Sequence, residues 1–281
     1  MHTGPPSPST FEKIPLSPAD YRSATDLLYR LARISEGAGK EELVRSRLTK
    51  RVRALSLPGF AECLRVVEGR PQGEEAATFV DLLTTNKTSF NREAAHFEYL
   101  RSTVLPRVED RGTKIRIWSA GCSSGEEPCT IAMHLREHHR DLSRRDALIL
   151  ATDISARVLA TARAGVYESA RIEGLLPEQE RRNFHRRKED GVDVVEVVPE
   201  VRSMIKFARL NLMGPWPMRG PFDAIFCRNV MIYFDRPTRE NLVRRFASLL
   251  VPGGTLFIGH SETLEADKVG LSYVKPAVYE K

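Results

Sequence analysis

The sequence predicts an α/β protein in which a mainly parallel sheet covered by helices follows a helical N-terminal domain. After Lys114, segments typical of strands and of helices alternate, an order that favours a parallel sheet with helices on both faces. Between Tyr21 and about Leu105 the apolar residues instead recur at helical spacing. The hydrophobic content of 41% and the charged content of 28% are typical of a globular protein. With 281 residues, the chain is long enough for two domains.

The N-terminal part divides into a tail and a helical domain. Residues 1–19 hold five prolines and few apolar side chains, which predicts a disordered tail. Residues 20–105 carry three apolar stripes at helical spacing: Leu27, Leu28, Leu31 and Ile34; Val44, Leu48, Val52 and Leu55; Phe79, Leu82 and Leu83. Residues 104–114 combine charge with a proline and a glycine, so we expect a linker there. The second predicted domain comprises residues 106–281.

In the second domain, β-branched and aromatic runs predict strands, and apolar residues at helical spacing predict helices. The strands are expected at residues 115–120, 147–152, 222–227, 254–258 and 273–279, and the helices at 128–138, 156–163 and 237–250. The alternation stops at about residues 177–210. There a charged helix precedes two short strands, at 192–198 and 204–208, which we interpret as a small antiparallel β-subdomain inserted into the domain.

Polar side chains follow the predicted strand at residues 222–227. Arg228, Asn229 and Tyr233 come directly after this apolar run. Open α/β sheets bind their ligands at the carboxyl ends of the strands. A cation, an amide and a phenol at that edge therefore indicate an active site.

The first strand leads into a turn of small residues, from Ser119 through Gly125, followed by Glu126, Glu127 and Pro128. Such residues let the backbone approach a ligand closely, but the turn has neither the GxGxxG pattern nor a phosphate-binding lysine. Two glutamates at a helix start oppose a pyrophosphate and attract an ammonium group. This favours S-adenosylmethionine (SAM) over NAD. The alternative is an ordinary acidic N-terminus of a helix.

The second strand ends at Asp153, about thirty residues beyond the glycine turn. A carboxylate at this edge can accept hydrogen bonds from both hydroxyls of a ribose. The alternative is that Asp153 caps the following helix. The glycine turn and the acidic strand end together predict a site for an adenosyl ligand.

These motifs together resemble the chemotaxis receptor methyltransferases, the CheR family. The resemblance covers residues 21–281 and lies in five stretches: residues 83–97, 118–128, 151–154, 222–234 and Gly259-His260-Ser261-Glu262. It implies a Rossmann-like SAM-dependent methyltransferase domain, a helical N-terminal domain and a small antiparallel β-subdomain. It also implies methyl transfer from SAM to glutamate γ-carboxylates of chemoreceptors, with S-adenosylhomocysteine as the product.

The resemblance implies a set of cofactor-binding residues: Asn86, Thr88, Arg92, one of Glu126 and Glu127 (with Glu127 preferred), Asp153, Asn211, Leu212, Arg228 and Asn229. Tyr233 would lie near the transferred methyl group, and Arg92 or Arg228 could bind the substrate carboxylate. We take Arg92 and Tyr233 as the catalytic pair. The alternative is a structural salt bridge and a buried phenol.

A basic helix face is the predicted substrate-binding surface. Arg47, Lys50, Arg51 and Arg53 lie on the predicted helix at about residues 41–55. A cationic face suits the glutamate-rich cytoplasmic helices of chemoreceptors. The alternative is a solvated helix face. Nucleic acid is not expected as a partner, because no aromatic residues are interleaved with the cluster. A receptor's C-terminal tether peptide is a possible second partner, adding a strand to the β-subdomain.

The remaining sequence features concern the cellular compartment and metals. Cys63, Cys122, Cys129 and Cys227 form no CxxC pair and have no accompanying histidine cluster. Free thiols in a reducing cytoplasm, without a metal, are therefore expected. No apolar run approaches the roughly 18 residues of a membrane span, so membrane insertion is not expected. Two functional alternatives stay open: a methyltransferase for another protein or a small molecule, and a non-catalytic SAM-binding signalling adaptor.

Overall fold

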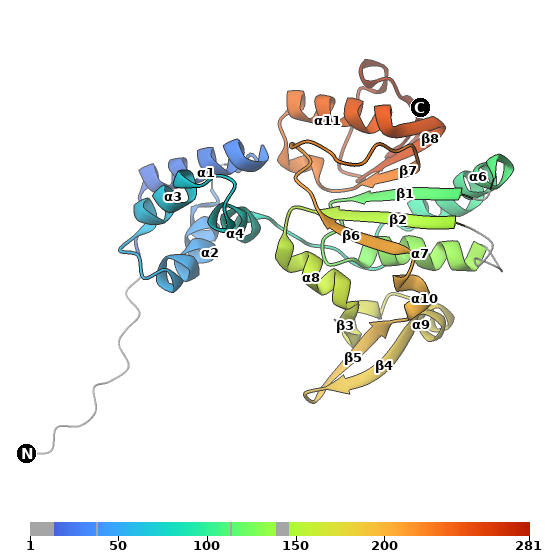
Figure 1. The fold of residues 1–281 in the computed structure, drawn as a ribbon, viewed down its shortest axis with the longest axis horizontal. Coiled ribbons are helices and arrows are strands. Elements are labelled where there is room, and N and C mark those ends of the chain that lie inside the picture. The colour runs from blue at the N-terminus through green and yellow to red at the C-terminus, as the bar shows by residue number, and fades with distance from the viewer. Residues whose placement is uncertain (1–13, 38, 113, 139–145) are drawn as a thin grey trace, which may run out of the picture. The chain divides into compact units, whose positions relative to one another are not determined.

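A computed structural model describes residues 14–37, 39–112, 114–138 and 146–281 (Figure 1). It divides into two compact units. The smaller consists of the described residues up to Leu31 together with Glu36–Leu83, and the larger of Ala32–Ser35 together with Thr84–Lys281. Most of the predicted tail, residues 1–13, lies outside the described residues. A helical unit and a unit with a mostly parallel sheet confirm the predicted fold class.

The smaller unit is a cluster of four helices: α1 (Pro18–Ala32), α2 (Glu41–Ala54), α3 (Phe60–Gly69) and α4 (Glu74–Leu83). The predicted stripes form its core, where Leu28, Leu48 and Phe79 are buried. Ile34 is an exception. Helix α1 ends before Arg33, which has a φ of 58°, and Ile34 belongs to the larger unit.

The larger unit begins earlier in the chain than the sequence pattern indicated. Its first helices are α5 (Ala95–Tyr99), the π-helix η1 (Leu100–Val104) and α6 (Leu105–Arg111). The prediction of a linker at residues 104–114 was therefore wrong. Leu100, Leu105 and Val108 are buried in one core with strand residues of the sheet. The charges of α6 conceal this apolar side, and Pro106 stands in the first turn of the helix, where proline is tolerated.

The main sheet has the order β6-β2-β1-β7-β8-β10-β9. Strands β1 (Lys114–Ala120), β2 (Asp146–Asp153), β6 (Ile205–Arg209), β7 (Phe222–Cys227) and β8 (Leu250–Ile258) are parallel. Strands β10 (Val278–Glu280) and β9 (Ser272–Lys275) continue it antiparallel. The chain order reverses between β1 and β7. In open α/β sheets such a reversal point is where a crevice forms at the carboxyl ends of the strands.

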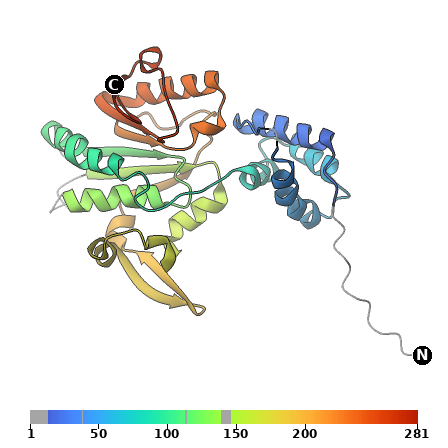
Figure 2. The same cartoon turned by 180° about the vertical axis from the view of Figure 1, so that it is seen from behind.

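Two apolar cores cover opposite faces of the sheet, because successive side chains of a strand point to opposite faces. Ile117 and Phe226 lie in the core with helices α7 (Glu126–His138) and α8 (Ala156–Ala164). Their neighbours Trp118 and Ile225 lie in the core with α11 (Arg236–Leu249). Figures 1 and 2 show α11 and α7 apart on either side of the sheet. Short helices connect the rest: η3 (Ser169–Ile172), η4 (Met231–Tyr233) and η5 (Ala266–Val269).

The β-subdomain is a three-stranded antiparallel sheet of order β3-β5-β4. It consists of β3 (Val166–Glu168), β4 (Phe184–Glu189) and β5 (Val192–Val197), with α9 (Pro177–Asn183) and α10 (Pro199–Arg202) beside them. The expected strand at residues 204–208 is β6, which pairs parallel with β2 in the main sheet. Assigning it to the subdomain was wrong. Strand β4 was missed because all its residues after Phe184 are exposed and mostly charged.

Two further expectations concern single features. All four cysteines are buried and unpaired by disulfides, which confirms the predicted free thiols. Among the described residues, no helix combines the length and the apolar character needed to cross a membrane.

Candidate active site

A cleft opens at the carboxyl ends of β1, β2, β6 and β7 in the larger unit. This is the edge that the sequence predicted for the site. The cleft brings together most of the predicted cofactor-binding and catalytic residues: Asn86, Thr88, Arg92, Glu127, Asp153, Asn211, Leu212, Arg228, Asn229 and Tyr233. Residues far apart in the chain thus meet at one concave site, the usual shape of a small-molecule site.

The turn after β1 forms one wall of the cleft. Gly121 has a φ of +88°, and a Cβ there would collide with the side chain of Val230. Only glycine lets the backbone pass so close to the loop after β7. The N–H groups of Gly121 and Cys122 donate to the carbonyl of Thr152, at 2.8 and 2.9 Å, which holds the turn against the end of β2.

Asp153 lies at the end of β2 and is 6% exposed. Its Oδ2 accepts a hydrogen bond from the Ser123 N–H and its Oδ1 from the Ser155 N–H, both at 2.9 Å. The alternative that Asp153 caps the next helix is wrong, because the N-cap of α8 is Ser155, whose hydroxyl accepts from the Val158 N–H at 3.2 Å. Two backbone donors hold the carboxylate at the cleft, where it can still accept further hydrogen bonds.

Arg228 lies between two glutamates in the base of the cleft. Its Nη1 is 3.1 Å from Glu127 Oε2, and its Nη2 is 3.1 Å from Glu93 Oε2. Nη2 also donates to the carbonyl of Arg92, and only 2% of the Arg228 side chain is exposed. The guanidinium is therefore occupied by the protein itself. This disfavours the alternative in which Arg228 binds a substrate carboxylate.

The pKa values of Glu127 and Glu93 are shifted in opposite directions. Burial raises the pKa of Glu127, although Arg228 and a 2.7 Å hydrogen bond from the Ser119 hydroxyl oppose it. Burial also acts on Glu93, but there the nearby Arg228 and the His260 N–H outweigh it, and the pKa of Glu93 is lowered. A negative charge on Glu93 at neutral pH follows.

Glu126 and Glu127 have different environments. Glu126 is fully buried, forms an ion pair with Arg171 and accepts from the Ser124 hydroxyl at 2.7 Å. It does not line the cleft, whereas Glu127 does. At the start of α7 these residues are one step apart, so their side chains point in different directions. Of the two alternatives left open by the sequence, the geometry favours Glu127.

A third glutamate shapes the loop after β7. Glu262 is 4% exposed, and its carboxylate accepts from three backbone N–H groups: Gly259 at 2.6 Å, Asn229 at 3.0 Å and Ile232 at 3.1 Å. Asn229 has a φ of 57°, a conformation that asparagine tolerates better than most residues. These contacts orient the loop so that Asn229 and Tyr233 line the cleft.

The guanidinium of Arg92 and the hydroxyl of Tyr233 are available to bind a ligand in the cleft. Arg92 is half-buried, and its Nη1 donates to the Lys87 carbonyl at 3.0 Å. No acidic side chain of the described residues pairs with it. Within the described part of the chain, the Tyr233 hydroxyl has no hydrogen-bond partner, while the Tyr233 carbonyl accepts from the Ser35 N–H at 2.8 Å. Both side chains can therefore bind a ligand without first breaking an ion pair.

Comparison with known proteins decides the family. Residues 86–278 match the family model described as "CheR methyltransferase, SAM binding domain", and residues 19–84 match "CheR methyltransferase, all-alpha domain". The chain belongs to the CheR methyltransferase family. The larger unit is thus a SAM-binding methyltransferase domain, and the resemblance found in the sequence is confirmed.

Relatives of this CheR-family chain match it over most of their length. A probable chemotaxis protein methyltransferase of Rhizobium etli is 41% identical over 244 residues, which cover 86% of this chain and 91% of the relative. The chemotaxis protein methyltransferase of Klebsiella aerogenes is 41% identical over 252 residues, covering 89% and 85%. That of Escherichia coli is 40% identical over 252 residues, covering 89% and 86%.

The predicted substrate-binding residues of this CheR chain lie on α2, in the smaller unit. Arg51 forms an ion pair with Glu75, and Arg47 Nη1 donates to the Leu83 carbonyl at 2.9 Å. These two side chains are half-buried and tie α2 to α4, whereas Lys50 and Arg53 are exposed. The basic face is therefore divided between structural and exposed cations.

Sequence reasoning missed three residues in or beside the cleft. It assigned Ile34 to a helical stripe and gave no role to Ser123, although both line the cleft. It also gave no role to Glu93, which does not line the cleft but pairs with Arg228 at its base. Ser123 had a possible signal, because it stands in the glycine turn and faces the acidic strand end. Ile34 had none, because only the folded chain brings residues 32–35 to the loop after β7.

Proposed function

We propose that this CheR-family chain transfers the methyl group of SAM to glutamate γ-carboxylates of chemoreceptors, forming glutamate methyl esters. One observation supports this most directly. The cleft combines an acidic acceptor, Asp153, with an arginine, Arg92, that no acidic side chain of the described residues neutralises. The first suits a nucleoside, and the second suits a substrate carboxylate.

The side chains of the cleft fit the proposed cofactor. The Asp153 carboxylate can accept from the two ribose hydroxyls, and the Glu127 carboxylate, which lines the cleft beside Arg228, can accept from the ammonium group of the methionine end. Asn211, Leu212 and Asn229 supply amides and an apolar surface for the adenine. SAM, once bound, supplies an electrophilic methyl group. No metal ion is needed for this chemistry.

The reaction depends more on the orientation of the substrate carboxylate than on a general base. A glutamate carboxylate, with a pKa of roughly 4.3, is already ionised at neutral pH. The chain's task is then to hold the carboxylate in line with the methyl group and to exclude water, which can contribute up to roughly 7–11 kcal/mol. Arg92 would bind the carboxylate, and the Tyr233 hydroxyl would orient it.

Two surfaces suit the proposed protein partner. Exposed Lys50 and Arg53 on α2 would attract the acidic cytoplasmic helices of a receptor, with Arg47 and Arg51 keeping α2 in place. Strand β4 is an edge strand of the β-subdomain and could pair with a receptor's tether peptide. The reaction would take place in the cytoplasm, where these receptor segments lie.

Transfer of labelled methyl tests the proposal. Purified chain and labelled SAM should modify a purified receptor cytoplasmic domain, and mild base should release the label, because a carboxyl methyl ester is hydrolysed where an N-methyl group is not. Label on another protein or on a small molecule instead would favour the first alternative function. Binding of SAM without any transfer would favour the adaptor.

Removing the Asp153 carboxylate should weaken cofactor binding. Asp153→Ala takes away a charged acceptor worth roughly 1.5–3 kcal/mol, so the Kd for SAM should rise about 10–150-fold in calorimetric titration. Asp235→Ala is the matched control. Asp235 also accepts from a backbone N–H, that of Thr238 at 2.8 Å, but lies outside the cleft. An equal loss of affinity in both variants would remove Asp153 from the cofactor site.

Reversing the exposed charges of α2 should slow receptor methylation. Lys50→Glu combined with Arg53→Glu should lower kcat/KM for the receptor on the order of tenfold at low ionic strength, and less at high salt. Affinity for SAM should not change. Arg22→Glu combined with Arg70→Glu makes the same charge change at other exposed positions of the smaller unit. If this control slows methylation as much, net charge and not the α2 surface is responsible.

A further inference from the structure

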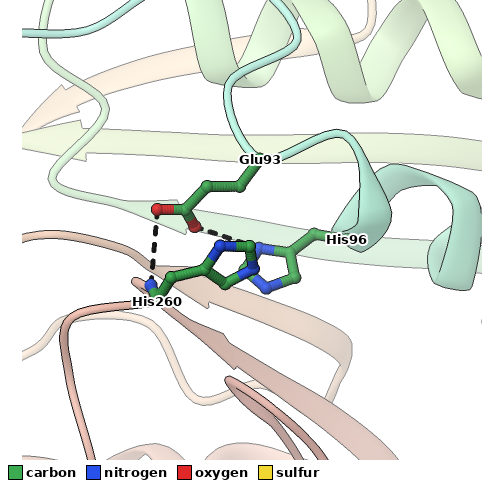
Figure 3. Close-up of side chains that lie close together, drawn as sticks. All are labelled: Glu93, His96 and His260. Carbon is green, nitrogen blue, oxygen red and sulfur yellow. Dashed lines mark hydrogen bonds and ion pairs between the residues drawn. The ribbon is translucent and has the colours of Figure 1, made fainter.

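Three side chains with metal-ligating atoms converge beside the active site. Glu93, His96 and His260 come from two distant parts of the chain, and Figure 3 shows their side chains turned toward one another. One ligand atom from each lies within 4.8 Å of the other two. The His96 Nδ1 is 3.4 Å from Glu93 Oε2, and the backbone N–H of His260 donates to Glu93 Oε1 at 3.3 Å. The carboxylate thus lies between the two histidines.

His96 is an unusual residue for a hydrophobic core. It is 1% exposed, and neither of its ring nitrogens has a hydrogen-bond partner among the described residues. A buried polar group left without a partner costs roughly 1–3 kcal/mol. Phe257 packs against the ring with a centroid distance of 5.5 Å, but it offers no acceptor. Packing alone therefore does not account for a histidine here.

The separation between His96 Nδ1 and Glu93 Oε2 matches that of two ligand atoms on one small cation. Zinc binds histidine nitrogen and carboxylate oxygen at roughly 2.0–2.2 Å in tetrahedral geometry, which places neighbouring ligand atoms about 3.3–3.5 Å apart. The 3.4 Å between His96 Nδ1 and Glu93 Oε2 lies in that range. His260 is exposed, with its ring centroid 4.9 Å from that of His96. One of its ring nitrogens lies within 4.8 Å of the ligand atoms of the other two residues.

The local charge also permits a cation. Arg228 is close to Glu93, but its Nη1 also contacts Glu127 at 3.1 Å, so its positive charge is divided between two carboxyl groups. Two imidazoles and one carboxylate suit zinc, cobalt or nickel, whereas magnesium and calcium prefer oxygen ligands only. Three protein ligands leave a fourth position for water.

We propose that Glu93, His96 and His260 form a binding site for a divalent transition-metal ion of the zinc type. The site is distinct from the cofactor cleft, because neither histidine nor Glu93 lines that cleft. It is adjacent to the cleft through Arg228, which binds Glu93 on one side and Glu127 on the other. The proposal does not depend on the methylated substrate.

Metal titration of the full chain tests the site. The metal-free protein should bind one Zn²⁺ by calorimetry, and one Co²⁺ should produce the visible absorption of a four-coordinate ion without a thiolate charge-transfer band. His260→Ala removes an exposed ligand and should keep the fold. It should weaken Zn²⁺ binding at least on the order of 10–100-fold, since even changes outside the ligand shell have effects of that size. Glu93→Gln should weaken it as well.

His185→Ala is the matched control, because His185 is an exposed histidine on β4, outside the cluster. It should bind Zn²⁺ as the wild type does. The proposal is overturned if the wild type binds no stoichiometric Zn²⁺, or if His260→Ala binds as tightly as the wild type. It is also overturned if the Co²⁺ spectrum shows thiolate ligands, since the four cysteines would then hold the ion.

Discussion

Replacement of Arg92 by alanine should lower the rate of receptor methylation on the order of 100-fold or more, with the fold intact. Arg92 lines the cleft, and its guanidinium donates a hydrogen bond to the Lys87 carbonyl at 3.0 Å. Its loss would leave the substrate carboxylate free to turn away from the methyl group, and a displacement of about 1 Å can cost on the order of 100-fold in rate. Single-turnover transfer of labelled methyl measures the effect.

The controls separate this role from a general effect of charge. Arg244→Ala removes an arginine of α11 that pairs with Glu240 at 3.5 Å outside the cleft, and it should keep the wild-type rate. Arg92→Lys keeps the positive charge but loses the planar fork, so it should recover only part of the rate. A wild-type rate for Arg92→Ala would take Arg92 out of the catalytic pair and leave Tyr233 alone.

Replacement of Arg228 by methionine should destabilise the larger unit by roughly 3–5 kcal/mol, the usual cost of leaving a buried charge without its partner. Glu93 and Glu127 would then face each other across the site without a counter-charge, and their side chains are only 13% and 11% exposed. Urea unfolding followed by tryptophan fluorescence measures the change, because Trp118 is buried in the same unit.

An exposed ion pair provides the comparison. Arg101 and Glu98 are 2.7 Å apart with side chains 49% and 60% exposed, so Arg101→Met should cost at most about 1 kcal/mol. Adding Glu93→Gln to Arg228→Met should restore part of the lost stability, since it removes one of the two unpaired charges. If Arg228→Met lowers the free energy of unfolding no more than Arg101→Met does, the buried ion pairs of Arg228 with Glu93 and Glu127 contribute little to stability.

The cleft was predictable to the extent that its residues follow strands. Asp153, Arg228 and Asn229 come directly after apolar runs, and parallel strands end at a common edge, so the sequence alone predicted their meeting. The partners of these residues were not predictable. The sequence provided only a slight preference for Glu127 over Glu126, whereas in the structure Glu126 pairs with Arg171 and Glu127 with Arg228. Pairing is decided by helix direction and packing, which the local pattern does not contain.

Strand pairing in the β-subdomain was also not predictable from the sequence. Strand β4 has no apolar alternation, because it is an edge strand whose side chains after Phe184 are exposed. The sequence pattern indicated strand β6 as the partner of β5, because β6 is short and follows β5 closely in the chain. It pairs instead with β2, where its backbone completes the parallel sheet. Strand pairing depends on long-range contacts that neither propensity nor spacing records.

By itself, the sequence determined most of the strands and helices, the family of the chain and the edge of the sheet that carries the site, but not β4 or α6. Those properties follow from local periodicity and from motifs of adjacent residues. Only the tertiary structure decided that Arg228 is held between two glutamates while Arg92 stays available, and that Glu93, His96 and His260 converge. The reason is physical: burial and ion pairing depend on which distant residues share a volume, and that volume exists only after the sheet has formed.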